Sequence, residues 1–412
     1  MPRAIEIDDA ARRRHLDWLL ELTQIPSAAG AEDRVIAWID RWLASRPGLW
    51  WRRDAWGNIV VGLAGMKASP SPLYLTAHLD HPAFVVERVL SPVAIELGFR
   101  GGVMDDYFDN ARVRLWPREN APVAGRLIAR VPPSRPQFKT FACELDAPAP
   151  WVRAGDIAVW ELPPASVEAV DGVACVCTLA CDDLAALAAA LAAVDAVLEA
   201  RSRGVPLGDV RLLLTRAEEI GFLGAIGACK AGTIEPAARL IALENSRSFA
   251  DSPIGAGPIV RVGDRVSVFS PELTGVVAEI AEAIAGTPAQ PRASDKAPEH
   301  APWRWQRKLM AGGACEASVY CAYGLQSTCV CLPLGNYHNM ADLAAVQARA
   351  NTTPPRVGRE YIAVEDYHGL VDLLVGCAIG LTGEAPAPPG FRVRAESIWS
   401  DLADILAPTS QA

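Results

Sequence analysis

The chain has 412 residues, of which 51% are hydrophobic and 21% are charged, a composition typical of a folded globular protein with room for more than one domain. Its formal net charge of -9 argues against a general nucleic-acid-binding protein, because no basic surplus is present to neutralise phosphates. No stretch reaches the ~18 apolar residues that span a bilayer, and no apolar signal region opens the chain, so we expect neither a membrane span nor secretion.

Both ends of the chain alternate between strand-like and helix-like patterns. An amphipathic helix is predicted near the N-terminus, and buried strands then alternate with helices. The predicted strands are 72–77, 209–215, 237–243 and 327–334, and the predicted helices are 182–204, 222–232, 271–286, 364–381 and 395–406. Near-continuous apolar strands between helices predict the α/β class, with a doubly wound mixed sheet covered by helices on both faces.

The middle of the chain has a different texture. From 84 to 172, short strand-like runs are broken by glycine and proline, and no helical pattern appears. We therefore expect a small all-β domain, a barrel or a sandwich, inserted into the larger α/β domain. That larger domain then comprises 1–83 and 173–412.

The ten cysteines are expected to be reduced. Cys175 and Cys177 alternate within one apolar run, and Cys329 and Cys331 within another, so each pair faces one side of a strand as small buried hydrophobic residues do. This pattern favours core thiols over disulfides or a zinc knuckle, and it indicates a cytoplasmic protein.

Acidic or imidazole side chains stand where several predicted elements begin or end. They are His78, Asp182, Glu218, Glu219, Glu244 and His338. Each alone has an ordinary explanation, such as a structural histidine, a helix cap or an exposed glutamate. Ligands of open α/β sheets bind outside the carboxyl ends of the strands, so joint placement at one rim favours a binding site.

The residue types in this set are those of a metal site. Two imidazoles with several carboxylates suit divalent zinc, cobalt or manganese, and two such ions would offset the repulsion between Glu218 and Glu219. One glutamate would then be a ligand, while its neighbour takes a proton from water activated between two ions about 3.5–4 Å apart. A polysaccharide hydrolase that uses the two as an acid pair is disfavoured, because that chemistry needs carboxyls ~5–9.5 Å apart across the sugar.

Seven stretches of sequence occur in the same order as the motifs of a known enzyme family. They are "QIPSAAGAED", "AHLDHPAFVV", "VRAGDIAVWELP", "CDDLAALAAAL", "TRAEEIGFLGA", "ALENS" and "AGGACEASVYCAYGLQSTCVCLPLGNYHN". In this order, and over nearly the whole chain, the sequence resembles the co-catalytic di-zinc aminopeptidases, especially their tetrahedral-aminopeptidase and glutamyl-aminopeptidase branch.

The resemblance implies a role for each residue of the site. Asp182 would bridge two metal ions. Glu219 and His338 would complete one ion, and His78 and Glu244 the other. Glu218 would be the general base and acid, and Asp80 would orient the ring of His78.

The implied activity is that of a metal-dependent aminopeptidase, which hydrolyses the N-terminal peptide bond of small peptides with a free N-terminus by means of a di-metal-activated water. Its cofactors would be two divalent metal ions, with zinc favoured over cobalt or manganese. The inserted β-domain would line the cleft and mediate a homo-oligomer, built from dimers and extending to a dodecamer.

Three positions depart from the family's usual pattern. Asp183 stands where this branch has asparagine, and Glu244 and Glu316 stand where it has aspartate. The ligand set remains chemically complete, so we expect activity. The identity of the carboxylate that binds the substrate amine, Glu316 or another, stays open.

Two other functions are weighed against the aminopeptidase. Di-zinc carboxypeptidases and N-acyl-amino-acid deacylases share the ligands, but their inserted domain is an α/β lid placed after the paired glutamates. A non-enzymatic protein on a peptidase scaffold would be expected to have lost Glu218 or a ligand, and none is missing.

The other histidines and one long loop complete the expectations. His81 is a candidate for contact with the ligands, whereas His15, His300 and His368 are expected to be structural or solvated. The loop 286–313 is either a surface connection or a wall of the substrate cleft, with Trp303 and Trp305 and with Arg304 or Arg307 facing a carboxylate.

Overall fold

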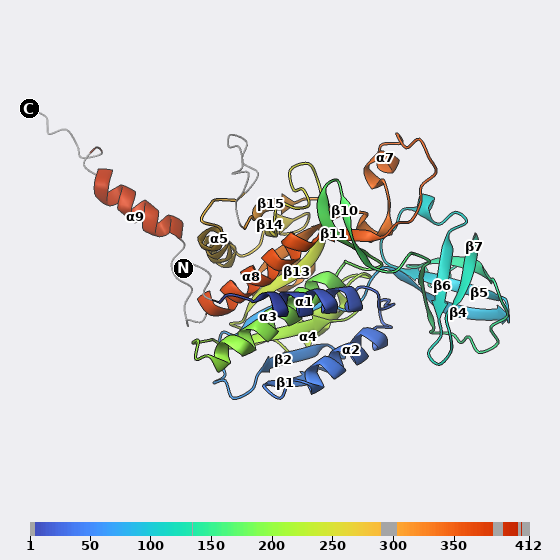
Figure 1. The fold of residues 1–412 in the computed structure, drawn as a ribbon, viewed down its shortest axis with the longest axis horizontal. Coiled ribbons are helices and arrows are strands. Elements are labelled where there is room, and N and C mark those ends of the chain that lie inside the picture. The colour runs from blue at the N-terminus through green and yellow to red at the C-terminus, as the bar shows by residue number, and fades with distance from the viewer. Residues whose placement is uncertain (1–4, 134, 290–302, 382–389, 403–404, 406–412) are drawn as a thin grey trace, which may run out of the picture.

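The computed structural model describes residues 5–133, 135–289, 303–381, 390–402 and 405, and shows an α/β body with a β-barrel at one end (Figure 1). The body is built on an eight-stranded sheet. In spatial order its strands are β1 (Leu49–Arg53), β2 (Ile59–Leu63), β12 (Val210–Thr215), β3 (Leu73–His78), β13 (Arg239–Arg247), β16 (Gln326–Leu334), β14 (Ile259–Asp264) and β15 (Gln306–Met310). The four adjacent strands β12, β3, β13 and β16 are parallel, whereas β2 and β14 run antiparallel to their neighbours among them. The predicted α/β class with a mixed sheet is confirmed.

Successive side chains of the central strands enter two different cores. Leu212 and Leu214 pack in the core that contains residues of five helices, whereas Leu213 packs in the core that contains residues of two others. The five are α1 (Asp9–Leu22), α2 (Asp33–Ala44), α3 (Leu184–Ser202), α5 (Pro271–Ala285) and α8 (Val364–Gly380), and the two are α4 (Leu223–Lys230) and α6 (Glu316–Ala322). Because strand side chains alternate between faces, both faces of the sheet are buried.

Helix α3 explains why one segment is so rich in alanine. Residues 184–194 are buried on every side of the helix, between the sheet, α1 and α8. Small side chains allow the neighbouring backbones to approach closely around a helix that has no solvent face.

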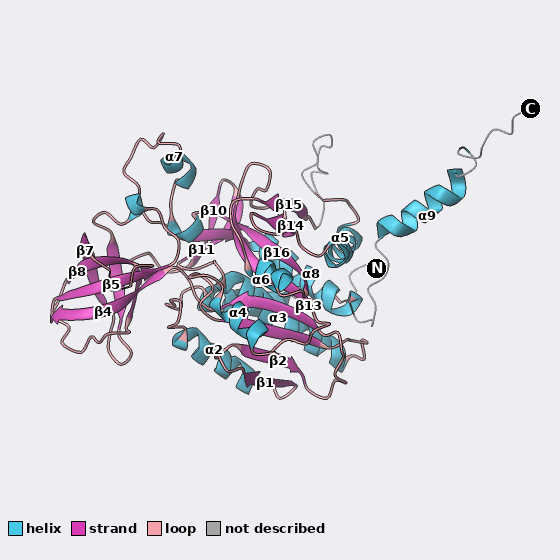
Figure 2. Ribbon diagram, turned by 180° about the vertical axis from the view of Figure 1, so that it is seen from behind, coloured by secondary structure: helices cyan, strands magenta, loops and turns pink. Residues whose placement is uncertain are grey.

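Six strands of the inserted region close into a barrel, which lies at the end of the molecule opposite α9 (Gly390–Leu402; Figure 2). They are β4 (Ala83–Ser91), β5 (Ala94–Arg100), β8 (Lys139–Leu145), β7 (Val123–Val131), β6 (Arg112–Trp116) and β9 (Ile157–Trp160). Aromatic rings fill the interior, among them Phe84, Phe99 and Trp160.

The last strand of the predicted insert belongs elsewhere. β10 (Ser166–Val170) pairs with β11 (Val173–Thr178), which pairs with β17 (Glu360–Ala363), in a separate three-stranded sheet. The barrel strands therefore end at Trp160, before the expected boundary at 172.

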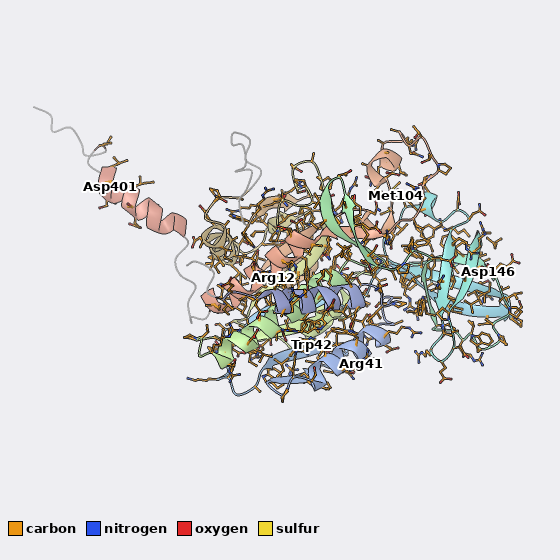
Figure 3. All side chains as sticks on the ribbon, in the orientation of Figure 1. Arg12, Arg41, Trp42, Met104, Asp146 and Asp401 are labelled. Carbon is orange, nitrogen blue, oxygen red and sulfur yellow. The ribbon has the colours of Figure 1, made fainter. Side chains whose placement is uncertain are left out.

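The barrel is tied to the body through the segment that follows β16. This segment contains the 3-10 turn η2 (Tyr337–Asn339) and the short helix α7 (Leu343–Gln347), and its Met340, Leu343 and Val346 are buried in the barrel core. On the barrel side lies the turn η1 (Asp105–Tyr107), whose Tyr107 hydroxyl donates to the carbonyl of Ala341 at 2.7 Å. Met104, labelled in Figure 3, directly precedes this turn.

The predicted placement of the two cysteine pairs is confirmed. All ten cysteines are free, with Cys175 and Cys177 in one small core and Cys329 and Cys331 in another. Among the described helices, none has both the length and the apolar character needed to cross a membrane.

Candidate active site

The carboxyl ends of the parallel strands bring the predicted site residues to one edge of the sheet. His78 is the last residue of β3, Glu218 and Glu219 follow β12, Glu244 lies within β13, and His338 follows β16. Parallel strands all end at the same edge, so this grouping follows from the topology.

Asp182 reaches the same edge from the second sheet. It follows β11 and precedes α3, and its carboxylate lies between two imidazoles. Its Oδ1 is 3.7 Å from Nε2 of His78, and its Oδ2 is 3.2 Å from Nε2 of His338. A carboxylate with one oxygen near each of two imidazoles is a candidate for a ligand shared by two cations.

The candidate ligand atoms are close enough to share ions. In each of three groups of three residues, one candidate ligand atom from every residue lies within 4.8 Å of those of the other two. They are Asp182 with Glu219 and His338, His78 with Asp182 and Asp183, and His78 with Glu218 and Glu219. Glu244 is buried nearby on β13 but belongs to none of these groups.

Several oxygens of this cluster are buried and unsatisfied. Among the described residues, Oδ1 of Asp182, Oε1 of Glu219 and Oε1 of Glu244 have no hydrogen-bond partner. Burial of a charged oxygen without a partner costs on the order of several kcal/mol, unless a cation compensates the charge. The donor set, imidazole and carboxylate, suits zinc and related divalent ions.

The electrostatics of the cluster lead to the same conclusion. Burial raises the pKa of Glu219 and Glu244 well above the usual glutamate range, and the charge of Asp182 raises both further. Burial also raises the pKa of Glu218, and Asp80 adds to the effect while His78 opposes it. A site that crowds so many carboxylates fits the binding of divalent cations.

Asp80 holds the turn that carries the paired glutamates. Its two carboxylate oxygens accept hydrogen bonds from the backbone N–H groups of Glu218, at 3.0 Å, and Glu219, at 3.1 Å. Nδ1 of His78 lies 3.1 Å from the backbone carbonyl of Asp80 and 3.5 Å from its carboxylate. Asp80 is therefore adjacent to the His78 ring and also holds the backbone of Glu218 and Glu219.

Buried polar residues surround the candidate ligands, and the sequence singled out only part of this set. His81 contacts the Asp182 carbonyl through Nδ1 and the Asn339 side chain, at 3.0 Å, through Nε2. Glu360, at the start of β17, accepts hydrogen bonds from the backbone of both Asp182 and His338. Nothing in its local sequence distinguishes Glu360 from a surface glutamate, because its partners are remote along the chain.

Glu316 is the buried first residue of α6, close enough to His78 for the two charges to interact. Its Oε2 is 3.3 Å from the Tyr320 hydroxyl and 3.5 Å from that of Thr76, and burial raises its pKa to about 7. Its Oε1 has no hydrogen-bond partner among the described residues.

A cavity of about 190 Å³ opens beside Glu244. Its wall includes Arg247, Arg261, Tyr337 and Met340. Arg261 is only 3% exposed, its Nη1 is 3.3 Å from the Ser246 hydroxyl, and its Nε has no hydrogen-bond partner within the described structure.

The long loop 286–313 lines this cavity through Met310, Gly312 and Gly313, but it does not supply the arginines of the cavity. Arg304 and Arg307 are not among its lining residues. Trp303 and Trp305 are buried in the main core instead, and Nε1 of Trp305 donates to the carbonyl of Thr287 at 3.0 Å.

The other histidines differ in what the structure shows. His15 is buried on α1, with Nε2 3.1 Å from a carboxylate oxygen of Asp195. His368 lies on α8, where burial lowers its pKa to about 4. His300 lies outside the described residues.

Solved structures with the same fold are known. The TET1 peptidase of Pyrococcus horikoshii is 20% identical, with a TM-score of 0.66 over 88% of this chain and 99% of its own. A TET aminopeptidase from a marine sediment archaeon of the Thaumarchaeota is 17% identical, with a TM-score of 0.69 over 90% and 98%. An aminopeptidase from Desulfurococcus kamchatkensis is 18% identical, with a TM-score of 0.66 over 92% and 97%.

These matches show that the chain has the fold of the TET aminopeptidases, as its motifs predicted. No protein-family model matches the sequence, and no curated protein matches it.

Proposed function

We propose that the protein is a metal-dependent aminopeptidase that removes the N-terminal residue of small peptides. The observation that carries this proposal is the position of Asp182 between His78 and His338, with Glu218 and Glu219 beside them, in a fold shared with aminopeptidases.

The proposed cofactors are two divalent ions, with zinc favoured. His338 and Glu219 would hold one, His78 and Glu244 the other, and Asp182 both. When bound, such ions activate a water molecule as the nucleophile and polarise the scissile carbonyl.

Glu218 is the proposed general base and acid. Its backbone is fixed by Asp80, and Oε2 lies 3.9 Å from Nε2 of His78, so the carboxylate stands at the edge of the ligand cluster. In this position it takes the proton from the attacking water and then delivers it to the amine of the leaving peptide. Its burial raises its affinity for that proton.

The cavity beside Glu244 is the proposed pocket for the side chain of the first residue. Its two arginines, one of them almost fully buried, favour a side chain that carries a carboxylate. The sequence pattern favoured Arg304 or Arg307 for such a contact, whereas the cavity favours Arg261 and Arg247.

Homo-oligomerisation is proposed as well. The TET1 peptidase of Pyrococcus horikoshii can assemble into a tetrahedron or a large octahedral shell. In this chain the barrel exposes Val89, Leu90, Ile128 and Trp151, which provide apolar surface for contact between copies. Light scattering coupled to size-exclusion chromatography tests this part of the proposal, and a monomer would contradict it.

Hydrolysis of matched dipeptides with a free amine or an N-acetyl group tests the activity. The protein is loaded with zinc or cobalt, with a chelated sample and a Glu218→Gln variant as controls. We expect cleavage of the free-amine series alone, lost on chelation and reduced by roughly 10²-fold or more in the variant.

Two other results would replace this assignment. Cleavage of the acetylated series alone would indicate a deacylase. No cleavage of either series, across several side chains, would indicate a non-enzymatic protein.

A further inference from the structure

We propose that Glu360 is a positioning residue, which holds the two chain segments that carry Asp182 and His338 at the separation that one of the two ion sites requires. The inference rests on the proposed metal centre and assigns a role to a residue outside its ligand set.

The contacts of Glu360 join segments that are far apart in the sequence. Its Oε2 accepts hydrogen bonds from the backbone N–H groups of Cys181, at 2.7 Å, and Asp182, at 3.0 Å. Its Oε1 accepts a hydrogen bond from the backbone N–H of His338, at 2.7 Å. One side chain therefore binds the backbone of a ligand from each of two different sheets.

These bonds require an acceptor oxygen on both sides of the side chain. Three N–H groups point at two oxygens, and a carboxyl group offers an acceptor on each side. A glutamine of the same size would turn an NH2 group toward one of the N–H donors and lose that contact. The side chain is fully buried, and no lysine or arginine of the described structure forms an ion pair with it.

A buried carboxyl group is costly unless it is hydrogen-bonded, and an apolar residue would suffice to begin strand β17. The three backbone hydrogen bonds compensate this cost only while both ligand segments stay in place. Glu360 therefore constrains the distance between the Asp182 and His338 segments.

The two proposed ion sites depend on Glu360 to different extents. Glu360 binds the backbone of two ligands of the site that His338 completes, namely Asp182 and His338. Of the ligands of the site that His78 completes, it binds the backbone of Asp182 alone, and the Asp182 carbonyl is also contacted by His81. We therefore expect loss of Glu360 to weaken the site that His338 completes more than the site that His78 completes.

Zinc titration of the metal-free full-length protein, in competition with a chromophoric chelator, tests this expectation. Wild type should bind two ions per chain. Glu360→Gln should bind one with unchanged affinity and the other more weakly by about 10–100-fold, the usual effect of losing a residue that supports a ligand.

Asp366→Asn is the matched control. Asp366 is a buried carboxylate on α8 that also accepts two backbone hydrogen bonds, from Gly255 and Gly257, but it binds no ligand segment. This variant should lose thermal stability and still bind both ions as wild type does. If Glu360→Gln fails to fold, Glu360→Asp, which keeps both acceptor oxygens on a shorter side chain, replaces it.

The outcomes separate this inference from the proposed function. Unchanged affinity for both ions in the Glu360 variant overturns the inference and leaves the metal centre intact. An equal loss in the Asp366 control also overturns it, because the effect would then be one of general stability. Wild type that binds no divalent ion would instead refute the proposed function.

Discussion

The backbone N–H of Glu218 donates a hydrogen bond to Oδ1 of Asp80 at 3.0 Å. The two residues follow neighbouring parallel strands, β12 and β3, so the contact links the turns at the ends of both strands. The proposed general base is thereby oriented through its own backbone, and the site combines residues that are distant in sequence.

Asp80→Asn should impair catalysis more than it impairs folding. Asp80 now accepts hydrogen bonds from two backbone N–H groups, and in the variant an amide NH2 would face one of these donors. That hydrogen bond would be lost, so the turn that carries Glu218 would shift. We expect kcat to fall by about 10–100-fold, with a loss in the free energy of unfolding of about 1–3 kcal/mol. Steady-state kinetics measures kcat and thermal unfolding measures stability, with Asp366→Asn as the control, because Asp366 is also a buried carboxylate that accepts two backbone hydrogen bonds. Equal kcat in both variants would contradict the role of Asp80.

Arg261→Met should remove the preference for an acidic first residue. The methionine fills a similar volume but leaves a substrate carboxylate without a charged partner, which costs roughly 10²-fold or more in affinity. The measurement is the ratio of kcat/KM for dipeptides that begin with glutamate to those that begin with glutamine. Arg201→Met serves as the control, because Arg201 donates to the Ala64 carbonyl and does not line the cavity. If this kcat/KM ratio is near one in wild type, the cavity does not distinguish a charged from a neutral first residue.

Removal of metal should lower the stability of the protein. The oxygens of Asp182, Glu219 and Glu244 that lack partners repel one another in a buried cluster, and bound cations relieve that repulsion. An ion at 1,000 times its Kd stabilises the folded state by about 4 kcal/mol per site. Thermal unfolding with a chelator, and again after zinc is restored, should show a reversible fall in Tm. A Tm that is independent of chelator would argue against a metal in this cluster.

Asp195 should make the stability of the body depend on acid pH. Burial opposes its ionisation, but hydrogen bonds from His15 and Arg14 and the charge of Arg46 lower its pKa to about 2. A carboxyl whose pKa is lower in the folded state stabilises the protein above its unfolded pKa, near 3.8, and this contribution disappears as the pH falls toward 2.

The Asp195→Asn variant measures that contribution. At neutral pH it should be less stable than wild type by about 1–2 kcal/mol, after allowance for solvent screening. The difference should narrow as the pH falls from about 4 to about 2. Denaturant unfolding across this range would show a constant difference if the carboxylate charge contributed nothing.

Much of the site was predictable because strand ends carry a local signature. His78 ends an apolar run, Glu218 and Glu219 follow another, and His338 follows a third, so the α/β pattern alone predicts that they share one edge. The barrel was also visible in the sequence, as short strands broken by glycine and proline. Its end at Trp160 was not, because β10 has the same local pattern and pairs with β11 outside the barrel.

The sequence by itself therefore determined the class of fold, the edge of the sheet that carries the site and the residue types gathered there, since hydrophobic periodicity and the residues that end each strand are local properties. Only the tertiary structure decided that Asp182 lies between two imidazoles, that Arg261 rather than Arg304 or Arg307 lines the cavity, and that Glu360 joins the segments of Asp182 and His338. The physical reason is that these relationships depend on hydrogen bonds and packing between segments far apart along the chain, which no local pattern encodes.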